Sequence, residues 1–262
     1  MEVIPVPVLE DNYSYLLVDG GSKTCGVVDP VTPSKVIEAA KERGVKITHV
    51  LTTHSHWDHA GGNEEIAKIF KEAGEELTVV GGKNDGIPAC TLPVGQGDTI
   101  QIGGIEVAVL DVPCHTPGHV AFLASCGAET PVVFTGDTLF VGGCGNFNSG
   151  TPEQMHHALI NVLGKLDDNT RVFVGHNYTE KNLRWALHVE PENPAVKAKL
   201  EETRKSNEEK VFISSTIGQE KQFNPFMRCV IPEIQQHFQT PGDEVATLLR
   251  VRRGKDEWGR SL

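Results

Sequence analysis

The chain has 262 residues, of which 39% are hydrophobic and 23% are charged, so it can bury a sizeable core and extensive disorder is excluded. A formal net charge of −11 argues against binding nucleic acid or an anionic membrane across the whole surface. The six cysteines are scattered without a Cys-x-x-Cys pair, and we expect them to be reduced and mostly buried.

The N-terminal residues have neither a charged segment followed by an apolar stretch nor an Arg- and Ser-rich amphipathic leader. No apolar run reaches the roughly 18 residues that are needed to span a bilayer. We therefore expect a cytoplasmic protein with no membrane partner. A mitochondrial form whose leader has been removed stays open.

Short apolar runs rich in β-branched residues fill the first two thirds of the chain, and Gly, Pro and Asp separate them. Their length and composition predict strands. In chain order, the predicted strands cover residues 15–18, 25–29, 49–52, 77–80, 105–110, 132–135 and 171–174.

Helical patterns lie between some of these strands. Residues 34–43 place apolar side chains at helical spacing, with Ser34 as the expected N-cap and Gly44 as the expected end. Residues 63–73 and 152–163 show similar patterns. Strands mixed with helices in a chain of this size predict a layered α/β architecture.

The composition changes after Tyr178. Residues 179–207 are rich in Glu, Lys, Ala and Leu, which favour helix, and residues 243–251 form another helical pattern beyond the break at Asn224-Pro225. We therefore predict a first domain over residues 1–178 and a smaller helical domain over residues 179–262.

The densest cluster of chemically active side chains lies in the run His54-Ser55-His56-Trp57-Asp58-His59, directly after the predicted strand 49–52. A strand end positions such side chains rigidly while they face a cleft. Imidazole and carboxylate donors suit Zn, Fe or Mn, and the absence of thiolate disfavours a closed structural zinc site. The run therefore predicts a metal site.

Three later polar residues also follow predicted strands, next to Gly or Pro. They are His115 after strand 105–110, Asp137 after strand 132–135 and His176 after strand 171–174. Each residue alone is typical of a turn. Together with the first cluster they form a candidate set of metal ligands.

This set resembles the His-x-His-x-Asp-His motif and later ligands of the metallo-β-lactamase superfamily, over about residues 1–178. The resemblance implies an αββα sandwich with the site at one edge. It also implies a binuclear centre in which Asp137 bridges both metals and His119 stays outside the ligand set. By position, the first metal takes His54, His56 and His115, and the second takes Asp58, His59 and His176.

Two divalent ions about 3.5–4 Å apart can share a water and lower its pKa to about neutral, which supplies a hydroxide nucleophile. Asp58 and Asp137 are accordingly the expected catalytic residues. We expect two divalent ions per chain, with zinc preferred and iron or manganese compatible with the same ligands.

Further segments resemble the glyoxalase II family, the hydroxyacylglutathione hydrolases, and extend the resemblance over nearly the whole chain. The segments are residues 135–140, 142–145, 150–151, 175–179, 224–228 and 252–256. The family hydrolyses S-D-lactoylglutathione and related S-2-hydroxyacylglutathiones to the hydroxy acid and glutathione, the second step of methylglyoxal detoxification. The resemblance also implies a monomer.

Glutathione carries two carboxylates, so an acidic protein needs a local cation to bind it. By resemblance, Arg252 and Lys255 meet the glycine carboxylate and Tyr178 contacts the glutathione backbone. Without the resemblance, the sequence would predict that Arg252 and Lys255 form a solvated basic end of a helix. After Gly-Cys-Gly the family often carries Lys, an aromatic residue and Tyr, whereas this chain has Asn146, Phe147 and Asn148, which can hydrogen-bond but supply no charge.

Other functions of the same fold stay open. They include a mononuclear-iron persulfide dioxygenase, a thioesterase for another thiol carrier, and hydrolases of β-lactams, lactones or phosphodiesters. The presence of Asp58, His59 and His176 favours two metals, and the helical C-terminal region has no evident use in a lactonase. A non-catalytic scaffold is disfavoured because the ligand set is intact.

Overall fold

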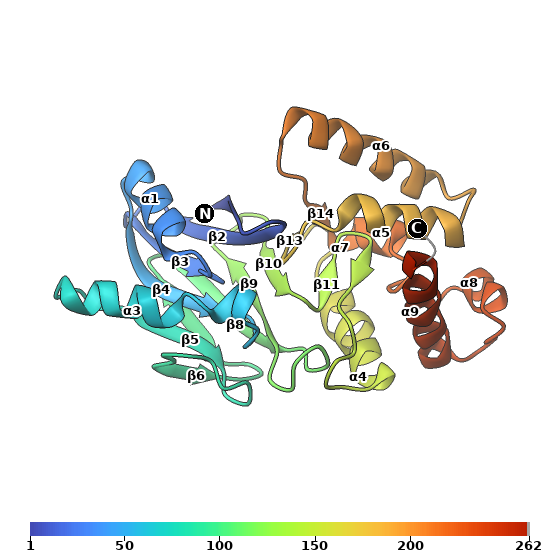
Figure 1. The fold of residues 1–262 in the computed structure, drawn as a ribbon, viewed down its shortest axis with the longest axis horizontal. Coiled ribbons are helices and arrows are strands. Elements are labelled where there is room, and N and C mark those ends of the chain that lie inside the picture. Colours follow the sequence, from blue (N-terminus) through green and yellow to red (C-terminus); the bar gives the residue numbers. More distant parts are fainter. Residues whose placement is uncertain (261–262) are drawn as a thin grey trace.

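The computed structural model describes residues 1–260 of the chain. Two mixed sheets face each other at the centre of the molecule (Figure 1). The N-terminal sheet has the strand order β1-β2-β3-β4-β5-β6. Its strands are β1 (Glu2–Val8), β2 (Asn12–Asp19), β3 (Thr24–Val28), β4 (Lys46–Thr52), β5 (Thr78–Gly82) and β6 (Leu92–Val94).

The second sheet has the order β14-β13-β10-β9-β8-β7, and its edge strand β14 comes from the C-terminal third of the chain. A separate two-stranded hairpin, β11-β12, follows β10. The strands are β7 (Thr99–Ile102), β8 (Ile105–Asp111), β9 (Val120–Ser125), β10 (Val132–Gly136), β11 (Leu139–Phe140), β12 (Gly143–Cys144), β13 (Arg171–Val174) and β14 (Ser215–Thr216).

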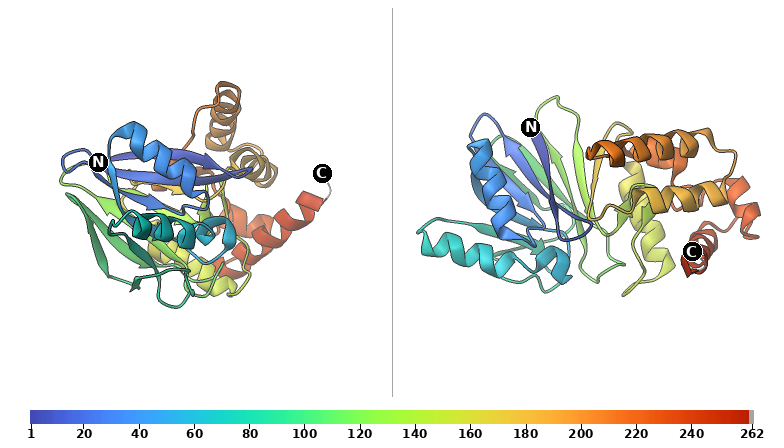
Figure 2. Two further views of the ribbon diagram at one scale, coloured as in Figure 1. Left: turned by 60° about the vertical axis from the view of Figure 1, so that its left-hand side comes forward. Right: turned by 45° about the horizontal axis from the view of Figure 1, so that its top comes forward.

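Helices cover the outer face of each sheet (Figure 2). Val36 and Ala40 of α1 and Ile66 of α3 share a buried cluster with β2, β3, β4 and β5. A second cluster between the sheets contains Tyr15, Phe122, Phe134 and Phe173. The three helices of the N-terminal half are α1 (Pro33–Arg43), α2 (Trp57–Ala60) and α3 (Asn63–Glu72).

The later helices pack on the second sheet. Val133 and Val172 of this sheet lie in one core cluster with Leu159, Leu183 and other side chains from the helices. The later helical elements are α4 (Pro152–His156), π-helical η1 (His157–Val162), 3₁₀-helical η2 (Leu163–Lys165), α5 (Thr179–Val189), α6 (Pro194–Glu209), α7 (Ile217–Phe223), α8 (Pro232–His237) and α9 (Glu244–Arg260). The layers are therefore those of an αββα sandwich followed by further helices, which confirms the predicted fold class.

The predicted strands are all confirmed, whereas some helix boundaries were wrong. Helix α1 begins at Pro33 with Thr32 as N-cap rather than at Ser34. Proline suits the first helical position because its fixed φ is helical and its missing N–H is not needed there. Gly44 ends the helix in the left-handed conformation, as predicted. The last helix continues to Arg260, well beyond the predicted residue 251.

The six cysteines are unpaired, and four of them are buried, as predicted for most of them. Among residues 1–260, no helix combines the length and the apolar character needed to cross a membrane.

Three polar side chains from the C-terminal helices hold the turn of the β11-β12 hairpin. Asn182 Nδ2 donates to the Val141 carbonyl at 3.0 Å, and Asn224 Nδ2 donates to the Gly143 carbonyl at 3.0 Å. The backbone N–H of Gly142 donates to Glu220 Oε2 at 3.0 Å. The position of this hairpin therefore depends on the helices that pack behind it.

Glu220 is fully buried, and its Oε2 also accepts a hydrogen bond from Asn224 Nδ2 at 2.8 Å. Burial raises the pKa of the Glu220 carboxyl to about 7. The folded protein therefore binds a proton there that the unfolded chain releases at lower pH, so this group reduces stability as the pH rises from about 4.5 to 7.

We predict that Glu220→Gln, which mimics the neutral acid, becomes more stable relative to the parent protein as the pH rises from 5 to 8. One pKa unit corresponds to about 1.4 kcal/mol. The difference in unfolding free energy between variant and parent should therefore change by an amount on the order of 3 kcal/mol between pH 5 and 8. Urea unfolding of both proteins at each pH, with the same metal concentration, measures it. A pH-independent difference would contradict the assignment.

Candidate metal centre

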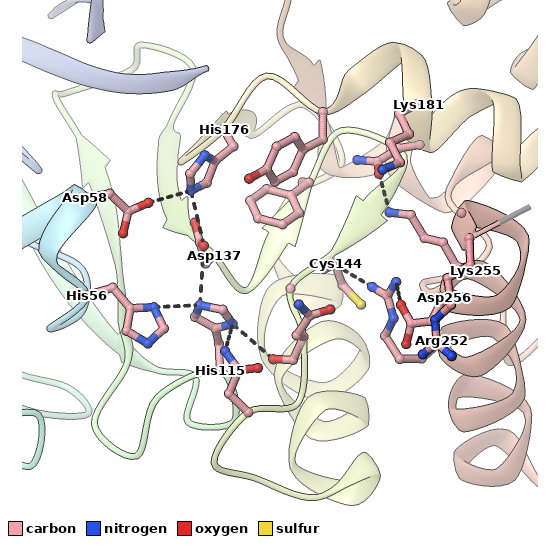
Figure 3. Close-up of a pocket in the computed structure, with 18 residues that line it drawn as sticks. His56, Asp58, His115, Asp137, Cys144, His176, Lys181, Arg252, Lys255 and Asp256 are labelled. Atoms are coloured by element: carbon pink, nitrogen blue, oxygen red, sulfur yellow. Dashed lines mark hydrogen bonds and ion pairs between the residues drawn. The ribbon is translucent and has the colours of Figure 1, made fainter. Parts of the chain in front are cut away.

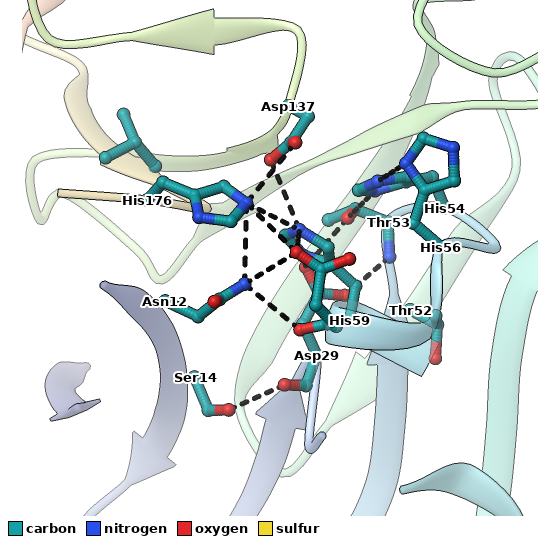
Figure 4. A network of polar contacts seen from close by, with 12 residues as sticks. Asn12, Ser14, Asp29, Thr52, Thr53, His54, His56, His59, Asp137 and His176 are labelled. Carbon is teal, nitrogen blue, oxygen red and sulfur yellow. Dashed lines mark hydrogen bonds and ion pairs between the residues drawn. The ribbon is translucent and has the colours of Figure 1, made fainter. Parts of the chain in front are cut away.

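The predicted donors come from four loops that follow strands of both sheets (Figures 3 and 4). His54, His56, Asp58 and His59 follow β4, and His115 follows β8. Asp137 follows β10, and His176 follows β13. The fold thus brings together side chains that are up to 122 positions apart in the sequence, and seven of them form three overlapping groups of potential ligands.

One group consists of three histidines. The Nδ1 atom of His56 lies 3.2 Å from His54 Nε2 and 3.0 Å from His115 Nε2. His54 is completely buried. His56 thus presents Nδ1 to the group, while the other two rings present Nε2.

A second group contains Asp58, His59 and His176. His176 Nε2 lies 3.2 Å from His59 Nε2 and 3.3 Å from Asp58 Oδ2. Asn12 Nδ2 donates to Asp58 Oδ2 at 3.0 Å and holds this carboxylate in place. The two groups share no residue.

Asp137 lies between the two groups. Its Oδ2 is 3.4 Å from His115 Nε2 and 3.4 Å from His176 Nε2, and its Oδ1 is 3.3 Å from His59 Nε2. Oδ1 is buried without a hydrogen-bond partner among the described residues. Burial by itself would raise the pKa of Asp137, but the neighbouring His59 and His176 lower it well below the usual range, so the carboxylate is ionised.

Hydrogen bonds on the outer nitrogens fix the orientation of the rings. The Nδ1 of His59 lies 2.9 Å from Asp29 Oδ2, and the Nδ1 of His176 lies 2.8 Å from Asp11 Oδ1. Because a carboxylate only accepts, each Nδ1 carries the proton.

The other two rings are fixed in the same way. The Nδ1 of His115 faces the Asn146 carbonyl at 3.0 Å. Thr53 Oγ1 donates to Asp29, so it accepts from His54 Nδ1 at 3.1 Å.

In all four rings Nε2 therefore points at the other donors. Burial alone would lower the pKa of His59 and of His176, but the neighbouring carboxylates raise both, which puts a proton on each Nε2. Such an arrangement fits a divalent cation, because a cation can take the place of these protons and be coordinated by the rings and the carboxylates.

The buried His119 supports the centre without joining any of the three groups. Burial and the neighbouring His115 lower the pKa of His119 to about 3, so the ring is neutral. The Asp137 backbone N–H donates to its Nε2 at 3.1 Å, and the ring stacks on His54. This position agrees with the prediction that His119 is not a ligand.

Two glycines let the backbone approach the donors. Gly136 has φ +46°, and a Cβ there would lie 2.4 Å from Thr53 Oγ1. A Cβ on Gly175 would lie 2.5 Å from Asp137 Oδ1. Both positions therefore require glycine.

A cavity of about 580 Å³ extends from the donors to the C-terminal helices (Figure 3). It is lined by all the predicted substrate-binding residues, which are Asn146, Asn148, Tyr178, Arg252 and Lys255, together with further side chains of α5 and α9. The Tyr178 ring stacks on His176 with a centroid separation of 4.8 Å. Burial raises the pKa of Tyr178, which stays a neutral phenol.

Arg252 and Lys255 are only 8% and 9% exposed and lie within α9, so they are not a solvated helix end. Arg252 donates to the Cys144 carbonyl and forms an ion pair with Asp256, and Lys255 donates to Asn182 Oδ1. Burial, followed by the charge of Arg252, lowers the pKa of Lys255 to about 7. Two cations buried side by side favour an anionic ligand.

Several residues of the site are absent from the sequence-based set. Asp29, Asp11 and Asn12 orient donors, and Asp29 adopts φ +48°, held by a hydrogen bond from Ser14 Oγ to its carbonyl at 2.6 Å. Asp29 directly follows β3, as the donors follow their strands, but the predicted strand 25–29 included it and so hid this signal. Lys181 and Asn182 line the cavity but read as ordinary helix residues in the sequence.

Comparisons with known proteins agree with this geometry. The family model described as "Metallo-beta-lactamase superfamily" matches residues 8–176, and the one described as "Hydroxyacylglutathione hydrolase C-terminus" matches residues 177–258. A crystal structure of ETHE1 from Myxococcus xanthus has the same fold, with a TM-score of 0.69 and 24% identity over 96% of this chain and 90% of that one. The class is therefore a metallo-β-lactamase-fold enzyme whose donors suit divalent metal.

Proteins with similar sequences identify the family within this class. The chain is 45% identical to a protein of Arabidopsis thaliana named "Hydroxyacylglutathione hydrolase cytoplasmic", over 98% of this chain and 99% of the relative. It is 43% identical to the "Hydroxyacylglutathione hydrolase" of Dictyostelium discoideum, over 91% and 90% of the two chains. The chain belongs to the hydroxyacylglutathione hydrolase family.

We predict that Asp29→Asn weakens metal binding by roughly 10- to 100-fold, as loss of a carboxylate that orients a histidine ligand does. Asp11→Asn should have a smaller effect, because the Asp29 side chain is 3% exposed and the Asp11 side chain 41%, so water can replace Asp11. Competition with a chromogenic zinc chelator measures both affinities. Equal affinities in the two variants and the parent protein would contradict the roles of these carboxylates.

Proposed function

We propose that this protein hydrolyses S-D-lactoylglutathione, and related S-2-hydroxyacylglutathiones, to D-lactate and glutathione, in the second step of methylglyoxal detoxification. The observation that carries the proposal is that one cavity joins the cluster of histidines and carboxylates to the buried cations Arg252 and Lys255. The relatives named hydroxyacylglutathione hydrolase support the same reaction.

For the metal centre, we propose two divalent ions per chain, with zinc preferred and iron or manganese as alternatives. His54, His56 and His115 would hold one ion, and Asp58, His59 and His176 the other. Asp137 would bridge them, since its two oxygens face histidines of both groups. Two donor groups that share no residue favour this arrangement over the single iron of a persulfide dioxygenase.

When bound, the two ions supply Lewis-acid charge that lowers the pKa of water and stabilises negative charge on the attacked carbonyl oxygen. Asp58 and Asp137 set the position of this charge, and for this reason we propose them as the catalytic carboxylates. Asp137 is buried, which strengthens its electrostatic contacts.

The side chains of the cavity orient the thioester. Arg252 and Lys255 bind the glycine carboxylate, and the Tyr178 hydroxyl contacts the peptide backbone of the thiol. Asn146 and Asn148 offer neutral hydrogen bonds beside His115. Water adds to the carbonyl carbon, the C–S bond breaks, and the thiolate leaves with the electron pair. A thiolate is a good leaving group, so the site needs no strong general acid.

Residues 1–178 would thus form the catalytic domain and residues 179–262 the substrate-binding domain. We further propose a cytoplasmic monomer that acts on a small molecule, without nucleic-acid or membrane partners. The name of the Arabidopsis relative supports the location.

Steady-state hydrolysis of S-D-lactoylglutathione, with metal content measured on the same sample, tests the reaction. We expect turnover with about two metals per chain. Asp137→Ala should lose metal and reduce kcat/KM by roughly 10³-fold or more, as removal of transition-state electrostatics does. Two bound metals without turnover would refute the substrate, and a single iron without turnover would point to the dioxygenase.

A second prediction concerns the buried lysine. Lys255→Met should raise the KM for S-D-lactoylglutathione by about tenfold and change kcat little, because uniform binding energy is lost. The matched control is Lys199→Met, which removes a buried lysine of α6 that does not line the cavity. A lower kcat with an unchanged KM would argue against the binding role.

A further inference from the structure

The cavity has one acidic end and one basic end. Asp58 and Asp137 lie among the histidines, whereas the other end is lined by Lys181 of α5 and by Arg252, Lys255 and Arg260 of α9. Asp256 is the one acid among the described residues that line the basic end. The α9 residues recur about every helical turn and so present one face to the cavity.

The two buried cations of α9 are already engaged with the protein. Arg252 forms an ion pair with Asp256, which offsets its charge, and donates a second hydrogen bond to the Cys144 carbonyl. Lys255 donates to Asn182 Oδ1. The net positive charge that these two residues offer to a ligand is therefore less than their number suggests.

Lys181 differs from both. It is exposed, yet its side chain lines the cavity, and Figure 3 shows it next to Lys255 at the basic end. Within residues 1–260 its ammonium group has no hydrogen bond or ion pair. Burial has the largest part in lowering the pKa of Lys255, and the charges of Arg252 and Lys181 lower it further. Like charges gathered at one end of a cavity repel one another unless an anion lies among them.

The loop of residues 146–148 supplies no cation to the cavity. Asn146 and Asn148 line the cavity there, and their side chains are neutral amides. A cation for the thiol part of a substrate therefore has to come from the helices.

We propose that Lys181 determines specificity by binding a carboxylate of the thiol part of the substrate, so that the preferred class is thioesters of thiols that carry more than one carboxylate. The inference rests on the proposed thioester hydrolysis and extends it. A small neutral thiol would leave Lys181 without an anionic partner, whereas glutathione offers two carboxylates to the cations at this end.

The test compares Lys181→Gln with the parent holoenzyme on two substrates that have the same acyl group, S-D-lactoylglutathione and S-D-lactoyl-N-acetylcysteamine, which has no carboxylate. At low ionic strength the variant should raise the KM for the glutathione thioester about three- to fivefold, as an exposed ion pair does. Its kcat, and its kinetics on the neutral thioester, should stay within twofold of the parent values. The KM difference should shrink in high salt.

Two further variants serve as controls. Lys181→Arg keeps the charge and should restore most of the affinity. Lys71→Gln makes the same change of net charge on α3, outside the cavity, and should match the parent protein. A parent-like KM in Lys181→Gln would overturn the inference. Equal losses on both substrates would also overturn it, because they indicate a structural role.

Calorimetric titration with S-methylglutathione, which cannot be hydrolysed, separates this inference from the proposed function. If the parent protein binds S-methylglutathione three- to fivefold more tightly than Lys181→Gln, the role of Lys181 stands even where the lactoyl thioester is not turned over. If neither protein binds S-methylglutathione, the inference fails. Turnover by the parent protein with no difference between the variants leaves the proposed function intact and removes Lys181 from it.

Discussion

The structure depends on the hydrogen bonds that hold the outer nitrogens of four histidine rings. Asp29, Asp11, Thr53 and the Asn146 carbonyl each accept from an Nδ1–H, so four Nε2 atoms converge with the carboxylates of Asp58 and Asp137. The packed strands fix the loops that carry these side chains, and the sandwich therefore holds the donors together. Folding and metal binding are therefore coupled, since the sandwich positions each ligand and a bound cation would displace the ring protons.

Hydrogen bonds between segments that are distant in the sequence also shape the other end of the cavity. The β11-β12 hairpin leads into the loop of Asn146, and its turn is held by Asn182, Glu220 and Asn224 of the C-terminal helices. Asn182 also accepts from Lys255. One set of buried amides thus connects the hairpin beside the metal centre to the cationic face of α9. The helices both cover the second sheet and shape the cavity wall.

Much of the fold could be predicted from the sequence because its signals are local. The β-branched runs gave the strands, and Gly44 gave the end of α1, since these preferences arise within a few residues. The boundary at Pro33 was missed because Ser34 offered a competing cap. Within residues 1–260, the strands that were not predicted are β1, β6, β7, β9, β11, β12 and β14. The two-residue strands β11, β12 and β14 carry no periodicity and form only through pairing and packing.

The sequence by itself predicted a layered α/β architecture and the donor residues of the candidate centre, because four potential ligands lie between His54 and His59 and the later donors follow predicted strands. The αββα class and the family were what its resemblance to known proteins implied. Only the tertiary structure decided which ring nitrogen each histidine presents, that Arg252 and Lys255 are buried, and that Lys181 lines the same cavity. Those features come from long-range contacts: Asp11 reaches His176, and Arg252 reaches Cys144. Residues that far apart in the sequence meet only after the sheets and helices have packed.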